Sequence, residues 1–278
     1  MTDAAQRRRE LGLFLKARRA QALRSDYGLP PVGRTREQGL RREEVAFLSA
    51  ISVTWYTWLE QGREISPSRQ VLETLARTLR LSETERAYVL SLAGYVSVPP
   101  SGTAVADVPP HVQRLLDALD PNPSFALAPD WGVEGWNRGY AALYPNIATV
   151  PSEERNLLWL VFTDPYVRSL LPDWDVTSSR FASEFRAEAG PRLGDSKIGY
   201  QIEKLKEASP EFRDTWARHD ILGFESRERL FHHPAVGVLR FEHHQVSPSD
   251  RPDLHIVVYT PAPGSDAAEQ MQLLMKLG

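Results

Sequence analysis

The 278-residue sequence contains no cysteine. A disulfide framework and a zinc site built on thiolates are therefore both excluded. Long apolar runs are also missing, since no stretch approaches the roughly 18–20 residues that a membrane-spanning helix requires. Arginines interrupt the first residues where a secretory signal would have its apolar core. These absences predict a cytoplasmic protein without a membrane segment.

Charge is distributed unevenly along the chain. Residues 1–95 contain 16 Lys and Arg against 11 Asp and Glu, whereas the remainder contains 17 against 25 together with all seven histidines. A basic region suits a polyanionic partner, because neutralising phosphates releases counterions. Two solvated surfaces of different composition would give the same counts. Charge alone therefore does not distinguish a polyanion-binding region from an ordinary solvated surface.

The segment 41–63, RREEVAFLSAISVTWYTWLEQGR, has the layout of a helix-turn-helix. A short amphipathic helix is expected first, followed by a tight turn at Ala50 and Ile51. A second helix begins at Ser52, whose side chain can cap the first turn. Such a helix fits the major groove of double-stranded DNA. The first helix is expected to turn inward Val45, Ala46 and Leu48, and the second Tyr56 and Leu59.

The outward face of the second helix is the candidate DNA-reading surface. Thr57 could contact a thymine methyl or a base edge, while Trp58 is expected to pack against sugar and phosphate. Its candidate residues are Ser52, Val53, Thr54, Thr57, Trp58 and Gln61. The candidate phosphate contacts are Arg34, Arg36, Arg41, Arg42 and Arg63. An ordinary helical hairpin with a solvated face is the alternative interpretation.

The rest of residues 1–95 is predicted to be helical. Leu11, Phe14 and Leu15 share one helical face, and the pair Ser82 and Glu85 forms a capping box. Another helix opens at residues 66–68 and ends its apolar face at Leu79; its inward residues are Val71, Leu72, Leu75, Ala76 and Leu79. Three prolines, at positions 99, 100 and 109, and the lack of periodicity mark residues 96–109 as a linker. The predicted domains are residues 1–95 and 110–278.

The second domain is predicted to have an α+β fold. Helical patterns dominate from Asn137 to about Arg218. Two short strands precede this block and three follow it, which indicates one antiparallel sheet with helices on one face. The predicted strands are Ser124–Ala128, Trp131–Trp136, Ile221–Phe231, Val236–Val246 and Leu254–Thr260. Such an arrangement can enclose a pocket between the sheet and the helices.

Residues 9–94 resemble the Xre-type helix-turn-helix of the lambda-repressor class, and within it the MmyB-like regulators. The resemblance rests on the LRREEVA segment Leu40–Ala46 and the WYxxLEQGR segment Trp55–Arg63. It continues into the second domain at Trp136–Asn137, Glu154–Asn156, Phe162–Pro165, Asp173–Trp174, Trp216–His219, His233–Pro234 and Gly237. It implies an all-α DNA-binding domain followed by a PAS-like ligand-binding domain. It also implies an effector such as a long-chain fatty acid and a role in secondary metabolism.

Three positions depart from the family pattern. Ala50 stands where the turn usually has glycine, so either a left-handed backbone there costs ~1 kcal/mol or the turn is reshaped. Trp58 replaces a residue that is usually basic, which puts one phosphate contact in doubt. Glu134 replaces a residue that is commonly apolar, which puts one wall of the ligand pocket in doubt.

An acyl-chain pocket needs an apolar lining and a polar mouth, and a carboxylate favours a fork of donors. The candidate ligand-binding residues are Trp136, Asn137, Tyr140, Arg155, Asn156, Trp159 and Phe162. The polar mouth would be formed by Asn137, Arg155 and Asn156. Helix capping is the alternative role for Arg155 and Asn156, and plain core packing is the alternative for each aromatic side chain.

The histidine pairs 232–233 and 243–244 could suggest a metal site. Neighbours on a strand point to opposite faces, so at most one histidine of each pair could converge on a metal ion. We expect no metal, no cofactor and no catalytic residue, because nucleophile-elbow, Walker and dinucleotide motifs are absent. The function predicted is a homodimeric transcription regulator that binds DNA and a small apolar effector, with the linker as a hinge. An enzyme using His219 and Asp220 and a protein–protein adaptor are the alternatives.

Overall fold

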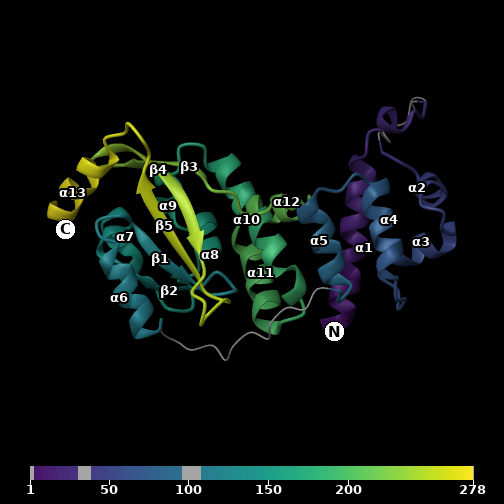
Figure 1. Cartoon of the computed structure of the whole chain (residues 1–278), viewed down its shortest axis with the longest axis horizontal. Helices are drawn as coiled ribbons and strands as arrows, with labels where there is room; N and C mark the ends of the chain where they lie inside the picture. The colour runs from purple at the N-terminus through teal and green to yellow at the C-terminus, as the bar shows by residue number, and fades with distance from the viewer. Residues whose placement is uncertain (1–2, 31–38, 96–107, 278) are drawn as a thin grey trace. The chain divides into compact units, whose positions relative to one another are not determined.

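A computed structural model describes residues 3–30, 39–95 and 108–277 (Figure 1). The chain forms two compact units that are not contiguous in sequence. Unit 1 comprises residues 1–98, 186–204 and 213–223, and unit 2 comprises residues 99–185, 205–212 and 224–278. Most of the expected linker lies outside the described residues, as do Arg34 and Arg36.

Unit 1 is helical, as predicted. Its N-terminal part contains α1 (Asp3–Gln21), a 3-10 turn η1 (Arg24–Tyr27), α2 (Arg42–Leu48), α3 (Val53–Glu60), α4 (Arg69–Thr78) and α5 (Glu83–Leu92). Leu11, Phe14 and Leu15 are buried, which confirms the inward face of α1. Position 12, on the same helix, requires glycine, because a Cβ atom there would come within 2.5 Å of the carbonyl oxygen of Glu60. This glycine allows α1 to pass close to the end of α3.

Serine caps define the starts of three helices in unit 1. The hydroxyl oxygens of Ser52, Ser68 and Ser82 accept hydrogen bonds from backbone N–H groups at 3.1, 3.3 and 3.2 Å. Ser82 and Glu85 form the predicted capping box, in which the Glu85 carboxylate accepts from the Ser82 N–H at 2.7 Å. Each cap satisfies a donor that would otherwise lack a partner in the first helical turn.

The turn between α2 and α3 keeps the left-handed conformation, which was one of the two alternatives for Ala50. Ala50 has a φ of 53°, and the N–H of Ile51 donates to the carbonyl oxygen of Ala46 at 3.0 Å. The prediction that Leu48 packs inward was wrong. The buried face of α2 instead follows Val45, Ala46 and Ser49, because a helix returns to the same face after four residues as well as three.

Unit 2 contains a five-stranded antiparallel sheet, which confirms the predicted α+β fold. Its strand order is β2-β1-β5-β4-β3. The strands are β1 (Ser124–Leu127), β2 (Val133–Trp136), β3 (Arg227–His233), β4 (Gly237–Val246) and β5 (His255–Pro261). The predicted start of β3 at Ile221 was wrong. Residues 221–226 lack the alternating pattern and contain Gly223, and they form no strand.

Helices cover both faces of this sheet, so the expectation of helices on one face was wrong. Val112 and Leu116 of α6 (Pro110–Ala118) pack against Ala126 of β1 and Ile256 of β5. The opposite face holds Phe125, because successive strand residues point to opposite sides. The neighbouring strands β1 and β5 carry apolar residues on both faces of the sheet, so both faces need to be covered.

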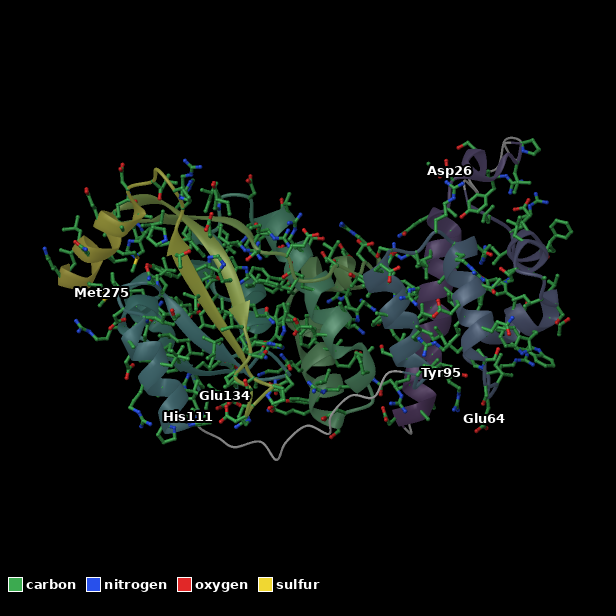
Figure 2. All side chains as sticks on the ribbon, in the orientation of Figure 1. Asp26, Glu64, Tyr95, His111, Glu134 and Met275 are labelled. Atoms are coloured by element: carbon green, nitrogen blue, oxygen red, sulfur yellow. The ribbon has the colours of Figure 1, made fainter. Side chains whose placement is uncertain are left out.

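The second face of the sheet is lined with aromatic rings. Tyr259 lies 5.2 Å from Phe231 and 6.1 Å from Phe125, measured between ring centroids, and Phe125 lies 4.5 Å from Tyr140. The remaining helices of the chain are α7 (Arg138–Leu143), η2 (Pro145–Ala148), α8 (Leu157–Thr163), α9 (Pro165–Leu170), α10 (Trp174–Ala189), η3 (Gly190–Arg192), α11 (Ser196–Ala208), α12 (Pro210–Trp216) and α13 (Ala267–Leu277). Side chains project from both the strands and the helices of unit 2 (Figure 2).

None of the helices in the described part of the chain combines the length and apolar character needed to span a membrane.

Candidate functional site

The outward face of α3 presents the residues predicted to read DNA. Tyr56 and Leu59 are buried and anchor the helix, as expected. Val53 and Trp58 are 39% and 38% exposed, and the side chains of Thr54 and Gln61 are exposed as well. The last turn of α2 adds a further apolar side chain, Phe47, which is 84% exposed. The sequence pattern did not indicate this residue. A surface this apolar on a small helical unit indicates a binding face.

The Thr57 hydroxyl is already engaged. It donates to the carbonyl oxygen of Val53 at 2.8 Å, within the same helix. This bond fixes the side-chain rotamer, while the hydroxyl oxygen can still accept and the methyl group can still make apolar contacts. Thr57 therefore holds its methyl group and its acceptor oxygen in a fixed orientation on α3.

The described arginines near α3 differ in how they are held. Arg41 is exposed, and its backbone N–H donates to Glu44 Oε2 at 2.7 Å. Arg63 is exposed and its guanidinium lies 5.6 Å from the Trp58 ring centroid. Arg42 instead pairs with Glu60, with its Nε 2.6 Å from Glu60 Oε2. Its side chain remains 40% exposed, so it is positioned by a partner inside the unit.

Glu60 is the charged centre of this region, and the sequence analysis did not identify it. Its side chain is 1% exposed and also accepts from Arg19 Nε of α1 at 2.6 Å. Burial alone would raise the pKa of Glu60, but the hydrogen bonds from Arg19 and Arg42 lower it below 4.5. The carboxylate thus ties α1, α2 and α3 together. Only its position one turn after the buried Tyr56 pointed to this role.

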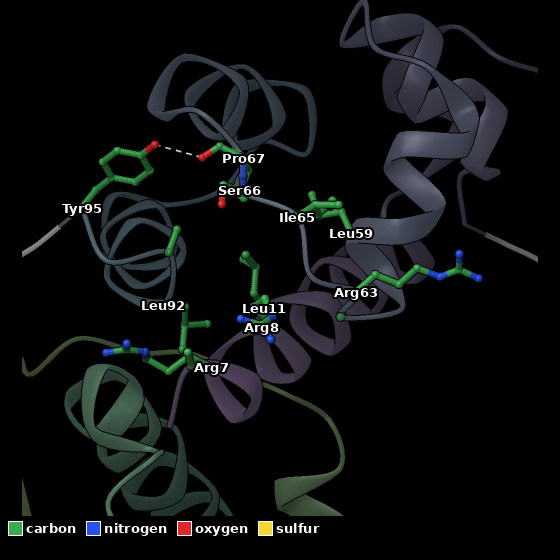
Figure 3. A pocket seen from close by; sticks show the side chains of 13 residues that line it. Arg7, Arg8, Leu11, Leu59, Arg63, Ile65, Ser66, Pro67, Leu92 and Tyr95 are labelled. Carbon is green, nitrogen blue, oxygen red and sulfur yellow. Dashed lines mark hydrogen bonds between the residues drawn. The ribbon is translucent and has the colours of Figure 1, made fainter. Parts of the chain in front are cut away.

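A cavity of about 190 Å³ lies beside the end of α3 (Figure 3). Its walls are the first turns of α1, the segment after α3 and the end of α5. The Tyr95 hydroxyl closes one side by donating to the carbonyl oxygen of Pro67 at 2.9 Å. Arg7, Arg8 and Arg63 are among its lining residues, and the guanidinium groups of Arg7 and Arg63 point away from the cavity (Figure 3).

His219, a residue of the enzyme hypothesis, belongs to a buried charge cluster in unit 1. Its Nδ1 lies 3.3 Å from a carboxylate oxygen of Glu10, which also contacts Arg186 and accepts from Tyr88 at 3.0 Å. Burial would raise the pKa of Glu10, but the His219 hydrogen bond and the Arg186 charge lower it to about 2. These contacts account for the polar atoms of the cluster within the fold.

In unit 2, the amide groups of Asn137 and Asn156 are used by the backbone. Asn137 Oδ1 accepts from the N–H groups of Ser124 and Tyr140, and its Nδ2 donates to two carbonyl oxygens. Asn156 Oδ1 accepts from the Trp159 N–H at 3.1 Å, and its Nδ2 donates to the carbonyl oxygen of Asp130 at 2.6 Å. The structure therefore shows the capping role that stood as the alternative for Asn156, and Asn137 caps α7 in the same way.

The other ligand-site candidates fall into separate groups. Arg155 and Trp136 come together, with the guanidinium 5.0 Å from the ring centroid. Tyr140 packs in the aromatic layer of the sheet. Phe162 lies elsewhere, against the rings of Trp174 and Phe212 at 5.7 and 5.1 Å. Trp159 is half-buried on α8, at the turn that Asn156 caps.

The histidine pairs point to opposite faces of the sheet, as predicted. His233 and His243 are buried, whereas their neighbours His232 and His244 are exposed or half-buried. Across the residues that the structure describes, three or more His, Asp or Glu side chains are nowhere grouped as a metal site would require. Burial is the first cause, ahead of the charges of Arg229 and His244, that lowers the pKa of His243 to about 3.

A helix-turn-helix with an exposed second helix, joined to an α+β unit, defines the protein as a DNA-binding transcription regulator with a ligand-binding domain. Residues 10–89 match the helix-turn-helix domain family. Residues 108–274 match the MmyB-like transcription regulator ligand binding domain, and the chain belongs to this family. The expected resemblance is thereby confirmed.

One curated protein also shows similarity. The mouse (Mus musculus) protein "TBC1 domain family member 30" is 36% identical over 98 residues, which are 33% of this chain. The match spans 12% of the mouse protein. A similarity this local carries no conclusion about function.

Proposed function

We propose that this regulator binds double-stranded DNA in a sequence-specific manner through α3. The observation that carries this proposal is the outward face of α3, whose opposite face is fixed in the core. On this face Thr57 is half-buried, and the exposed residues are Val53, Thr54, Trp58 and Gln61. Ser52 caps this helix, and its N-terminal dipole adds a favourable field for phosphate. Base edges in the major groove would meet Thr57 and its exposed neighbours.

Phosphate contacts are assigned to the arginines that flank α3. Arg41 and Arg63 carry exposed guanidinium groups, and Arg42 is held in place by Glu60. Arg34 and Arg36 remain proposed contacts on the strength of the sequence. The regulator is expected to act as a homodimer, because such readers bind half-sites ~34–36 Å apart or at multiples of that distance.

Unit 2 is proposed to bind a small apolar effector, of which a fatty acid is the preferred class. Aromatic rings cover one face of its sheet, and a chain of about a dozen methylenes would gain on the order of 10 kcal/mol from burial before ordering costs. Trp136, Tyr140, Arg155, Trp159 and Phe162 remain proposed contacts. The PAS-like character of this unit also remains a prediction. The effector acts on DNA binding only if it prefers one state of the protein.

The DNA proposal is tested by selecting duplexes from a random pool at moderate ionic strength, followed by affinity measurements at several salt concentrations. Arg63→Ala should weaken binding to all duplexes and lower the salt slope by roughly one contact. Arg240→Ala is the matched control, because Arg240 is an exposed arginine of unit 2 that pairs with Glu228. Failure to enrich any duplex, together with a salt-independent protein complex, would favour the adaptor alternative.

The effector proposal is tested by native mass spectrometry of protein purified from cells. A co-purifying acyl compound is the expected result. A chain that carries no such compound and takes up none on addition would count against an acyl effector, while leaving the DNA proposal intact.

A further inference from the structure

Arg229 of β3 projects into the interior of unit 2. Burial alternates along the strand, so that Arg229, Phe231 and His233 point to the aromatic face of the sheet while their neighbours are exposed. The Arg229 side chain is only 8% exposed. An arginine at an inward-facing position of a strand is unusual, because a charged group removed from water requires partners.

The partners of this guanidinium are incomplete. Its Nε and Nη2 are fully buried, and neither has a hydrogen-bond acceptor among the described residues. The nearest carboxylate is that of Glu184 on α10, whose Oε2 lies 3.9 Å from Nη2. That distance exceeds a hydrogen bond. The guanidinium also lies 5.0 Å from the centroid of the Phe181 ring, which can offer only a cation–π contact.

The local charge is positive. The other oxygen of Glu184 accepts from Arg227 Nη2 at 2.7 Å, so this carboxylate faces two guanidinium groups. His243 adds a third polar group, since its Nδ1 is buried and has no hydrogen-bond partner among the described residues. At neutral pH this imidazole is uncharged, because burial and the charge of Arg229 lower its pKa. The site therefore lacks an anion with two acceptor oxygens.

The surroundings of this site are apolar and aromatic. The His243 ring lies 5.2 Å from that of Tyr259, which in turn contacts Phe231. Phe181, beneath the guanidinium, lies 6.0 Å from Trp131. An anionic group that reached Arg229 would therefore be attached to an apolar body rather than to a hydrated metabolite.

We propose that Arg229 binds the carboxylate of the acyl effector inside unit 2, with His243 Nδ1 as a second contact. This assignment rests on the proposed function and names the head group that the site selects. A carboxylate supplies a bidentate acceptor for the guanidinium and completes its hydrogen bonds. Arg155, the polar residue suggested by the sequence, donates through Nη2 to the carbonyl oxygen of Val150 at 3.1 Å and has one buried nitrogen, Nε, without a partner among the described residues, whereas Arg229 has two.

The test compares two probes of equal chain length on the delipidated full chain, tetradecanoic acid and 1-tetradecanol. Binding is measured by titration calorimetry at pH 7.5. The wild type should bind the acid about ten- to a hundredfold more tightly than the alcohol, as expected for charged hydrogen bonds. Arg229→Met should remove this preference while leaving alcohol affinity unchanged within about twofold. Arg240→Met, at an exposed arginine of the same sheet, should leave both affinities unchanged.

A second variant and a stability measurement separate ligand binding from a structural role. Arg229→Lys keeps the charge but loses the planar fork, so it should reduce acid affinity severalfold without affecting the alcohol. Thermal melting of Arg229→Met without ligand should occur at or above the wild-type temperature, since replacing an incompletely paired charge with an apolar side chain removes a cost. A lower melting temperature with an unchanged preference for the acid would overturn the assignment.

The outcomes distinguish this inference from the proposed function. If both probes bind equally to the wild type and to Arg229→Met, the acyl effector stands and the role of Arg229 falls. If neither probe binds the wild type, the acyl effector falls and the assignment of its carboxylate falls with it.

Discussion

Glu60 in unit 1 and Arg229 in unit 2 are both charged side chains in the interior, but their surroundings differ. Glu60 lies between two arginines, each with an Nε atom 2.6 Å from one of its oxygens. Arg229 has two buried nitrogen atoms without acceptors and shares a distant carboxylate with Arg227. The first charge is matched within the chain, whereas the second is not.

The difference indicates what each region is built to do. A matched buried charge fixes the relative placement of α1, α2 and α3, and thereby holds the reading helix rigid. An unmatched buried charge lowers stability unless a partner arrives from outside. Unit 1 is therefore a scaffold for a surface, while unit 2 is proposed to keep an interior position for a ligand.

The sharpest way to break this comparison is to remove the matched charge. Glu60→Ala leaves Arg19 and Arg42 without their partner, so it should cost unit 1 about 3–5 kcal/mol of stability. Hydrogen exchange of the amides in α1 and α3 measures this loss. Glu64→Ala, at an exposed glutamate, should change stability by less than about 0.5 kcal/mol. A loss below ~1 kcal/mol for Glu60→Ala would show that the pairing is not a scaffold.

Acid should weaken unit 1 through Glu10. Its folded-state pKa of about 2 lies below the value of 4.5 for an unperturbed carboxyl. The stabilisation is therefore present above pH 4.5 and is lost as the pH falls toward 2, with a size on the order of 2–3 kcal/mol. Denaturant melts at pH 5 and pH 3 should show a smaller drop for Glu10→Gln than for the wild type. The exposed Glu43→Gln variant should retain the full drop, and an identical drop in all three proteins would contradict the assignment.

A substitution at Thr57 tests whether the outward face of α3 distinguishes between DNA sequences. Thr57→Ala should reduce discrimination against single base-pair changes in the selected duplex by about 1–3 kcal/mol at one position. Thr74→Ala is a matched control, because the Thr74 hydroxyl makes the same bond within α4, to the carbonyl oxygen of Gln70 at 2.9 Å. Competition binding with variant duplexes provides the measurement. An equal loss on every duplex would mean that Thr57 does not read sequence.

The smallest effect is expected at the turn between α2 and α3. Ala50→Gly removes the Cβ penalty at a φ of 53°, and the gain is partly offset by the freedom of glycine in the unfolded chain. Stability should rise by less than about 1 kcal/mol. Ala93→Gly, at a φ of −82°, should instead lower stability, and chemical denaturation compares the two. A loss at Ala50 as large as that at Ala93 would mean that the left-handed turn carries no strain.

Local pattern sufficed to predict much of the fold. Helical spacing, serine caps and alternating strands depend on neighbours within a few residues, and they located the reading helix, its inward face and four of the five strands closely. The prediction that Leu48 points inward was wrong, because the sequence of a seven-residue helix is compatible with two different buried faces. Helices on both sides of the sheet were missed for a related reason. Ala126 and Ile256 are apolar residues that would suit either an exposed or a covered face of a sheet. Only their packing against α6 shows that this second face is covered.

The candidate sites were less accessible from sequence. Glu60 pairs with arginines 41 and 18 positions away, and this separation leaves no periodic signal. Arg229 did leave one, because it occupies the inward phase of β3 with Phe231, although its missing acceptors appear only in three dimensions. Asn137 and Asn156 carried the residue types of a polar mouth, but the same amides are also well suited to helix caps.

The most direct test of the account measures affinity for the selected duplex at fixed salt, with and without saturating tetradecanoic acid. The account predicts a change of at least about fivefold in the wild type, the lower end of typical coupling between two sites, and a smaller change in Arg229→Met at an acid concentration that saturates the wild type but not the variant. An affinity that is identical with and without the acid, in a protein shown to bind both acid and duplex, would contradict it.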